Sequence, residues 1–335
     1  MSLLRLVVAL GALVGSAQPR GGAPMTTLDI LAYDQPHLRG QAALSAGGQP
    51  CQLAWSGRDA RLSCALALAP AATEMTLTGE LSRESGRRMQ KGTMRWQVID
   101  IGPALRHLRD RTRPMGDRFR AFVREKAAFE ARHAAVLEGF GLSNAEADSP
   151  AAIADAEKRL GFSLPADHRH LLSTVGALII GDSSMTRAAE TRRSYEAVIK
   201  DWDTPKADLD KDLSKATRAL LEASALLFTQ VGDGYGGLLY RPSGEAACGG
   251  GPAYYWIHQD GIDEARLLTR HDGTCADYAD ALMRPLAEDG LQRYEDTEPG
   301  VVVVDRSAPG PMRLQLTDDG NGFVFRLRPD WDLFR

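Results

Sequence analysis

The chain has 335 residues, of which 44% are hydrophobic and 25% are charged, and these values are ordinary for globular proteins. This length allows two or three domains. The formal net charge of −4 makes nucleic acid an unfavoured partner, because surfaces that bind phosphate groups are usually basic.

The first 17 residues have the pattern of an export signal peptide. Arg5 supplies a positive charge, Leu6 to Val14 is an apolar run, and Gly15-Ser16-Ala17 offers small residues for cleavage. The run is shorter than the ~20 apolar residues of a membrane span. The pattern predicts a periplasmic or secreted protein with no integral membrane span after cleavage. If translation starts at Met25 instead, the protein is cytoplasmic.

The chain contains four cysteines, and an even number after an export signal favours two disulfides. Cys51 and Cys64 flank two short strand-like runs, so a hairpin can bring them together. Cys248 and Cys275 flank an aromatic strand, which makes this second pairing plausible. The alternative is four buried thiols, favoured if the chain starts at Met25. The spacings do not indicate a zinc site.

Residues 25–102 show the alternation of small antiparallel strands. Apolar and polar residues alternate in several runs, with glycine, proline and serine between them. This pattern predicts a β-sandwich-like domain, which by itself says nothing about a functional site.

Residues 103–148 change to helical periodicity and are rich in arginine, with a break near Pro114. One interpretation is a basic docking face for a phosphate or an acidic partner. The other is a solvated connecting helix with internal ion pairs, and the interleaved acidic residues favour it. We therefore expect a helical connector followed by a polar linker, with the domain boundary near residue 149.

The stretch from Ile153 to Leu172 predicts two short helices. Ser149 is a good N-cap, Pro150 suits the first helical turn, and Gly161 can end the first helix in the left-handed conformation. Pro165 starts the second helix. The polar insert from Arg187 to Leu221 is also helix-like. Three later segments read as a glycine-rich strand pair, an aromatic strand and a closing helix: residues 231–240, 255–258 and 276–282.

The order of these features resembles the SMI1/KNR4, or SUKH, family. In Ile153 to Leu172 the resemblance lies in the pattern I-x-x-x-E-x-x-L-G-x-x-L-P-x-D-x-R-x-L-L (one-letter codes), and over the chain it covers about residues 149–294. The insert between Gly181 and Ala225 departs from the shortest family members. The resemblance implies a mixed sheet packed with helices, and binding rather than catalysis. Bacterial members are similar to immunity proteins, which inactivate a cognate toxin by covering its active site.

After Glu298 the pattern returns to strands, including Val301 to Val304 and a hairpin with its turn at residues 318–322. We assign these strands to a SUKH-like domain spanning residues 149–335. The predicted fold class is therefore α+β: a β-sandwich-like module, a helical connector, and a mixed sheet with helices and a C-terminal β-hairpin.

The sequence contains no strong catalytic pattern. The glycines between Gly232 and Gly237 lack the arrangement of a phosphate-binding loop. His168, His170, His258 and His271 could meet aspartates in space as one metal site or one acid/base pair, but His168 and His170 lie on two sides of one helix, which argues against joint metal binding. We predict no catalytic residue, no cofactor and no metal.

Aromatic and acidic residues near the 232–260 hairpins are the candidate partner surface. Tyrosine and tryptophan carry large contact energies at protein interfaces, although they also dominate protein cores. The residues expected to contact a partner are Asp233, Tyr235, Tyr254, Trp256, His258 and Asp260.

These features together predict a non-catalytic immunity protein that neutralises a bacterial toxin in the envelope by direct contact. The cognate toxin is expected to be encoded by a neighbouring gene. The alternatives are an envelope scaffold protein associated with the cell wall and, less favoured, an envelope hydrolase.

Overall fold

The structure is a computed structural model. It describes residues 26–32, 45–46, 49–50, 52–56, 59–68, 74–82, 89–201, 205–230, 236–258, 265–270, 272–291, 294, 300–307, 312–318 and 323–328. The predicted export signal and Cys51 lie outside these residues, so the pairing of Cys51 with Cys64 stays a prediction.

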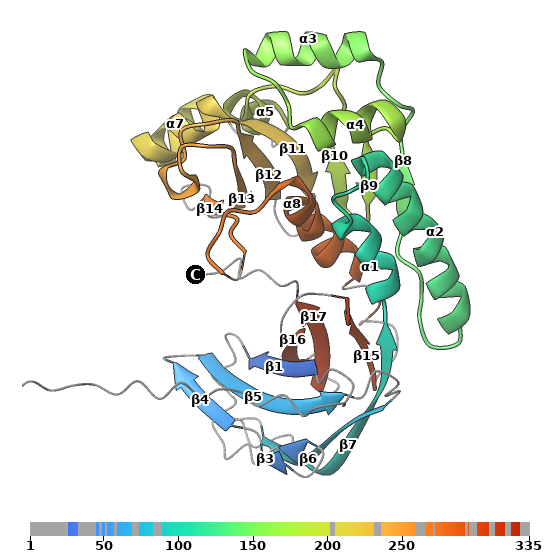
Figure 1. The fold of residues 1–335 in the computed structure, drawn as a ribbon. Helices are drawn as coiled ribbons and strands as arrows, with labels where there is room; N and C mark the ends of the chain where they lie inside the picture. The colour runs from blue at the N-terminus through green and yellow to red at the C-terminus, as the bar shows by residue number, and fades with distance from the viewer. Residues whose placement is uncertain are drawn as a thin grey trace, which may run out of the picture.

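The described residues form an α+β fold with eight α-helices (Figure 1). The helices are α1 (Gly102–Arg109), α2 (Met115–His133), α3 (Pro150–Leu160), α4 (Ala166–Thr174), α5 (Ser194–Asp201), α6 (Lys206–Asp212), α7 (Lys215–Ala223) and α8 (Tyr278–Pro285). A short 3-10 helix, η1 (Ala246–Cys248), and a π-helix, η3 (Leu286–Leu291), accompany them. The insert predicted to be helical contains α5, α6 and α7.

A seven-stranded sheet forms the centre of the α+β part, with neighbouring strands antiparallel throughout. Its strand order is β14-β13-β12-β11-β10-β9-β8. The strands are β8 (Leu142–Asn144), β9 (Leu178–Ile180), β10 (Ser183–Met185), β11 (Ala225–Gln230), β12 (Gly236–Arg241), β13 (Ala253–His258) and β14 (Arg266–Leu267). Because β8 precedes residue 149, the sheet begins inside the predicted linker.

The start of α3 follows the sequence prediction closely. The Ser149 hydroxyl accepts a hydrogen bond from the Ala152 amide at 3.2 Å, and Pro150 occupies the first turn. At the other end Gly161 adopts the left-handed conformation, with φ of 75°. An amide left without a partner at a helix start is satisfied by such a cap, and glycine reaches positive φ at little steric cost. These residues turn the chain from α3 into α4.

Helices cover both faces of the seven-stranded sheet. Apolar residues of α5, α6 and α7 pack with Leu226, Leu239 and Tyr255 in a smaller core. Helices α3, α4 and α8 pack on the other face, within a larger core that continues through α1 and α2 to β7. A sheet with both faces packed has strands with few polar residues, as Ala253 to Ile257 of β13 illustrates.

The remaining strands form two five-stranded sheets, ordered β17-β16-β1-β5-β4 and β15-β7-β6-β2-β3, which lie below the α+β part in Figure 1. The early strands are β1 (Thr26–Ala32), β2 (Ser45–Ala46), β3 (Gln49–Pro50), β4 (Gln52–Ser56), β5 (Asp59–Leu68), β6 (Glu74–Ser82) and β7 (Met89–Asp100). The late strands are β15 (Val301–Val304), β16 (Met312–Asp318) and β17 (Phe323–Arg328).

The late strands pair with the early ones, which differs from their predicted place in a domain spanning 149–335. Strand β15 runs parallel to β7, and β16 runs parallel to β1. Strand β17 pairs antiparallel with β16. The two ends of the chain therefore build the same pair of sheets. The physical reason is that β7 and β1 each have an edge that a parallel strand completes, and the late strands supply it.

Candidate functional site

Two residues of the predicted partner surface are buried. Tyr254 is 5% exposed and Trp256 is 6% exposed, and both belong to the larger core. Strand β13 lies inside the sheet between β12 and β14, and both of its faces are covered. This corrects the prediction that these two side chains offer a contact surface. His258, at the end of β13, is exposed, whereas Asp233, Tyr235 and Asp260 lie outside the described residues.

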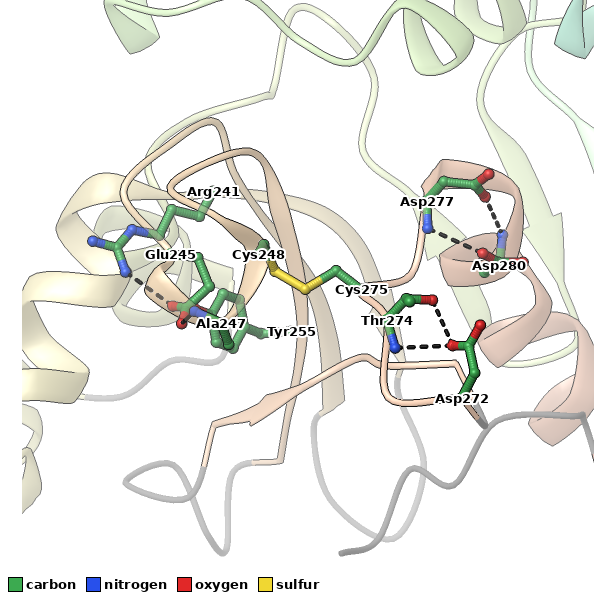
Figure 2. Close-up of a disulfide and its surroundings, with 10 residues drawn as sticks. All are labelled: Arg241, Glu245, Ala247, Cys248, Tyr255, Asp272, Thr274, Cys275, Asp277 and Asp280. Atoms are coloured by element: carbon green, nitrogen blue, oxygen red, sulfur yellow. Dashed lines mark hydrogen bonds and ion pairs between the residues drawn. A yellow bond between two sulfur atoms is a disulfide. The ribbon is translucent and has the colours of Figure 1, made fainter.

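The predicted disulfide between Cys248 and Cys275 is present, with its Cα atoms 5.7 Å apart (Figure 2). Cys248 ends η1, in the loop that connects β12 to β13, and Cys275 lies just before α8. The bond therefore fixes the 242–252 loop to the start of α8. We call the surface of residues 242–252 and 272–275 the braced loops.

Hydrogen bonds also order the 242–252 loop from within. The Glu245 carboxylate accepts hydrogen bonds from the Tyr255 hydroxyl and, at 3.2 Å, from the Ala247 amide. Arg241 forms an ion pair with the same carboxylate at 3.4 Å. The Gly244 amide donates to the Gly250 carbonyl at 2.8 Å. Hydrogen bonding from Tyr255 lowers the pKa of Glu245, so the carboxylate that orders the loop is ionised at neutral pH.

The exposed side of the braced loops carries small residues. They are Ser243, Gly244, Ala246, Ala247, Gly249, Gly250, Pro252, Asp272, Gly273 and Thr274. Gly249 and Gly250 have positive φ, and a Cβ atom added at either would meet nothing within 4 Å. The loop backbone is therefore accessible from outside while its conformation is held from inside.

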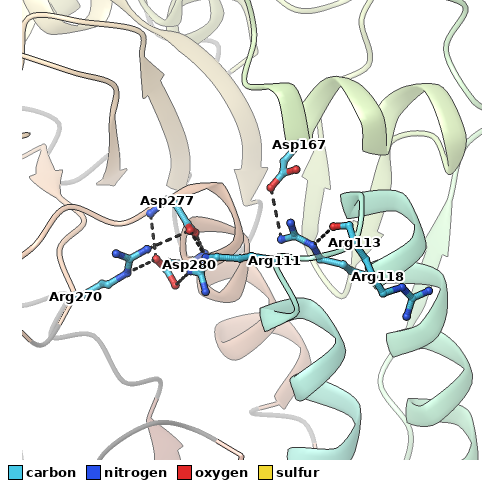
Figure 3. Close-up of polar contacts among 7 residues, drawn as sticks. All are labelled: Arg111, Arg113, Arg118, Asp167, Arg270, Asp277 and Asp280. Carbon is cyan, nitrogen blue, oxygen red and sulfur yellow. Dashed lines mark hydrogen bonds and ion pairs between the residues drawn. The ribbon is translucent and has the colours of Figure 1, made fainter.

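Next to the braced loops, two arginines bracket the first turn of α8 (Figure 3). Asp277 and Asp280 form a reciprocal capping box there. Arg111, from the turn between α1 and α2, donates to Asp277 at 2.7 Å and to Asp280 at 3.2 Å. Arg270 donates to Asp280 at 2.7 Å and to Asp277 at 3.1 Å. This four-residue network joins the helical connector to the end of the braced loops.

The two carboxylates of this network have opposite pKa shifts. Burial raises the pKa of Asp277, but hydrogen bonds from Arg111 and from the Asp280 amide, together with the charge of Arg111, outweigh burial and leave that pKa below its usual value. Burial, followed by the neighbouring charge of Asp277, raises the pKa of Asp280. Two negative charges close together in a partly buried place repel each other, so the carboxylate with the stronger hydrogen bonds ionises first. Here Asp277 is that carboxylate, and its charge raises the pKa of Asp280.

Most of the connector arginines bind acidic groups of the protein itself. Besides Arg111, four of them form ion pairs with carboxylates: Arg109 with Asp305, Arg118 with Asp167, Arg120 with Asp117, and Arg132 with Glu125. These pairs support the interpretation of an ion-paired connector over that of a basic docking face. The pairs of Arg109 with Asp305 and of Arg118 with Asp167 join segments far apart in the sequence, and such pairs cannot be predicted from local spacing.

The histidines of α4 occupy separate environments, as predicted. His168 is fully buried, and its Nδ1 atom lies 2.9 Å from the Tyr278 hydroxyl. Burial lowers the pKa of His168 to about 3, so the ring is neutral at pH 7. His170 instead accepts a hydrogen bond at Nδ1 from the Gly116 amide at 3.0 Å. Within the described residues, histidine, cysteine and carboxylate groups form no cluster of three or more suited to a metal ion.

Comparison of the chain with protein-family models, with curated proteins and with solved structures finds no match. Among the described helices, none has the length and apolar character required to cross a membrane.

Proposed function

We propose that this protein is a non-catalytic binding protein that neutralises a cognate bacterial toxin in the cell envelope by direct contact. The observation that carries the proposal is the braced loops, whose conformation is fixed by the Cys248–Cys275 disulfide and by the Glu245 hydrogen bonds. A surface ordered before binding loses less conformational entropy when a partner docks, and this favours protein recognition.

The arrangement of residues 149–294 supports a SUKH-like domain as part of this proposal. The α3–α4 hairpin leads into the sheet, the strands β11, β12 and β13 follow as neighbours, and α8 closes the unit against α4. These are the segments on which the resemblance rests. We further propose that the two five-stranded sheets form a sandwich-like module with a C-terminal hairpin, and that this module holds the SUKH-like domain in the envelope.

The disulfide supports an oxidising location. Disulfides persist in secreted and periplasmic proteins and are rare in the cytosol of most organisms. Together with the export pattern of residues 1–17, the Cys248–Cys275 bond favours the periplasm or the exterior of the cell.

The proposal is tested by co-purification with the product of the adjacent gene, using mature protein exported to the periplasm. We expect a stable complex that suppresses the toxicity of that product. Ala246→Arg places a long charged side chain on the exposed face of the braced loops and should weaken the complex at least tenfold. Ala154→Arg, at an exposed alanine of α3, is the matched control and should leave affinity unchanged.

Two results would count against the proposal in different ways. If no neighbouring gene product binds, the immunity function is wrong. If the complex forms but Ala246→Arg binds as tightly as the unchanged protein, the braced loops are not the contact surface. The double variant Asp233→Ala with Tyr235→Ala then tests the glycine-rich turn that the sequence analysis selected.

A further inference from the structure

The turn between α1 and α2 presents Arg111 toward the start of α8. The Asp110 carboxylate accepts hydrogen bonds from the Thr112 amide at 3.1 Å and from the Thr112 hydroxyl. The Arg113 amide donates to the Asp110 carbonyl at 3.3 Å, which closes the turn. Arg111 therefore extends from an ordered turn, and its guanidinium reaches the two carboxylates of the first turn of α8 (Figure 3).

The first turn of α8 depends on nearby positive charge. The Asp280 amide donates to the Asp277 carboxylate at 3.0 Å, and the Asp277 amide donates to the Asp280 carboxylate at 3.0 Å. This capping box satisfies amides that a helix start leaves unpaired, but it also brings two negative charges together in a partly buried place. The guanidiniums of Arg111 and Arg270 offset the repulsion, because Asp277 Oδ2 accepts hydrogen bonds from both.

The two arginines differ in the segment to which they belong. Arg270 is part of the turn that precedes α8: its amide donates to the Thr274 carbonyl at 2.6 Å, and its carbonyl accepts from the Gly273 amide at 2.9 Å. It therefore moves together with that turn. Arg111 comes from the helical connector, so its hydrogen bonds join the turn and the start of α8 to a separate part of the fold.

The Cys248–Cys275 disulfide extends this series of contacts to the 242–252 loop. Cys275 directly follows Thr274, and Cys248 lies within the loop (Figure 2). Inside the loop, the Gly250 amide donates to the Glu245 carbonyl at 2.8 Å. A continuous path of hydrogen bonds and one covalent bond thus leads from the connector to both halves of the braced loops.

We propose that Arg111 is a positioning residue for the braced loops, and that it acts through Asp277 and Asp280. This inference rests on the proposed function, in which the braced loops are the surface that meets the partner. The contact surface of the SUKH-like domain is then held in place by a residue from outside the 149–294 segment. Loss of Arg111 makes the loops less ordered before binding, which raises the entropic cost of forming the complex.

The test is amide hydrogen exchange of the mature protein without any partner, followed by NMR. Arg111→Gln removes the charge and the forked geometry of the guanidinium. Hydrogen bonds to charged groups are lost, so we expect exchange about tenfold faster at the hydrogen-bonded amides of Gly273, Ala276 and Gly250. The urea midpoint should change little, because the Arg111 side chain is 47% exposed and exposed ion pairs contribute little to stability.

Two variants and one direct reading separate positioning from a general effect on stability. Arg111→Lys should give an intermediate result, since one ammonium does not reproduce the fork of donors. Arg106→Gln, at an exposed arginine of α1, is the matched control and should change none of these amides. Carboxyl NMR should show a higher pKa for Asp277 in Arg111→Gln, because Arg111 helps to lower that pKa.

The disulfide step is tested in the double variant Cys248→Ala with Cys275→Ala. In that background Arg111→Gln should still speed exchange at Gly273 but should no longer affect Gly250. A response of Gly250 that persists there would overturn the proposed path to the 242–252 loop.

Three outcomes of the exchange experiment decide the inference. Faster exchange confined to the braced loops and Ala276 supports it. Unchanged exchange at Gly273 in Arg111→Gln would overturn it. So would equal acceleration at the Ala197 amide of α5, since that result would mean a general loss of stability.

The partner provides a separate measurement. The complex with the adjacent gene's product should dissociate about tenfold faster for Arg111→Gln, in proportion to the lost ordering. Loosened loops in a protein that binds no neighbouring gene product would refute the proposed function alone. A complex that forms while Arg111→Gln leaves the exchange unchanged would refute the positioning role alone.

Discussion

At the scale of single residues, one titratable side chain, His168, is fully buried in the core. His168 is a titratable side chain in a core position, bonded to Tyr278 and stacked edge-on against it with ring centroids 5.4 Å apart. A neutral imidazole with one satisfied nitrogen tolerates this environment, but a charged one does not. The residue therefore couples the stability of the fold to pH.

The first prediction concerns this coupling. The folded-state pKa of His168, about 3, lies below the unfolded value of 6.5. Between these two pH values the unfolded chain carries a proton on His168 and the folded chain does not. Stability from this residue is therefore constant above pH 6.5. It falls by about 1.4 kcal/mol per pH unit between pH 6.5 and the folded pKa. Urea unfolding at pH 7.5, 5.5 and 4.5 measures it.

A substitution isolates the contribution of His168 from that of other groups. His168→Gln keeps a hydrogen-bonding side chain but cannot take up a proton, so its stability should fall less steeply below pH 6.5 than that of the unchanged protein. The exposed His258→Gln serves as the comparison. Identical slopes for His168→Gln and the unchanged protein would show that folding does not lower the pKa of His168.

At the scale of elements, short segments are fixed by caps and a cross-link. The Ser149 cap at α3 has a counterpart at α7, where the Ser214 hydroxyl accepts from the Thr217 amide at 3.2 Å. Both positions are readable from sequence because capping depends on neighbours only three residues apart. The Cys248–Cys275 bond was also predictable, since both cysteines flank one strand.

The second prediction is that Ser149→Ala lowers the free energy of unfolding by about 1 kcal/mol, because the Ala152 amide loses its acceptor. Ser149→Asp, which restores an acceptor at the same place, should regain most of this loss. Chemical denaturation of the three proteins side by side makes the measurement. Equal stability of Ser149→Ala and the unchanged protein would mean that water replaces the hydroxyl without cost.

The third prediction concerns the disulfide, which closes a loop between two cysteines 27 residues apart in the sequence. In the chain-entropy account, a loop of this size lowers the entropy of the unfolded chain enough to stabilise the fold by about 3.5 kcal/mol. The double variant Cys248→Ala with Cys275→Ala should lose roughly that amount. It should also become sensitive to protease within residues 242–252. Calorimetry and limited proteolysis measure the two effects.

Reduction of the Cys248–Cys275 disulfide in the unchanged protein tests the same contribution to stability. Treatment with a dithiol reductant should reproduce the behaviour of the double alanine variant. If the variant loses stability but its 242–252 loop stays resistant to protease, the Glu245 hydrogen bonds order the loop without the cross-link. The braced loops would then not depend on an oxidising environment.

The features that sequence reasoning missed are those set by distant partners. Tyr254 and Trp256 were expected at a surface, although β13 has apolar residues at every position from Ala253 to Ile257, a pattern typical of a strand covered on both faces. The Asp167–Arg118 ion pair joins residues 49 positions apart on different helices, and no local pattern signals it. The sequence shows which residues of a strand are apolar, but the topology of the sheet determines which elements pack on them.

At the scale of the whole molecule, the α+β part is an insertion between β7 and β15. The chain leaves β7 at Asp100 and returns beside it, with Val304 paired in register to Asp100. The Asp100 carboxylate accepts from the Gly102 amide at 2.8 Å and from the Arg306 amide at 3.1 Å, which ties the outgoing and returning segments together. Arg109 adds an ion pair to Asp305 at the same junction.

This topology makes the folding of the early strands dependent on the last part of the chain. Val301 to Val304 are at most 6% exposed and belong to the larger core. Burying a valine stabilises a fold by about 1.5 kcal/mol or more, so four of them contribute roughly 6 kcal/mol or more. That amount is comparable to the whole stability of many domains, which is about 5–15 kcal/mol. Residues 25–102 should therefore not fold as an independent domain.

The last prediction follows from this dependence. A fragment of residues 25–298 lacks β15, β16 and β17. We expect it to lose the β-sheet signal of the early strands and to unfold at a lower temperature and less cooperatively than the 25–335 protein. Adding a peptide of residues 299–335 in trans should restore both, because it supplies the parallel partners of β7 and β1. Circular dichroism and thermal unfolding measure the recovery. A 25–298 fragment as stable as the 25–335 protein would instead mean that the early strands are complete without the late ones, as the domain boundary at residue 149 had suggested.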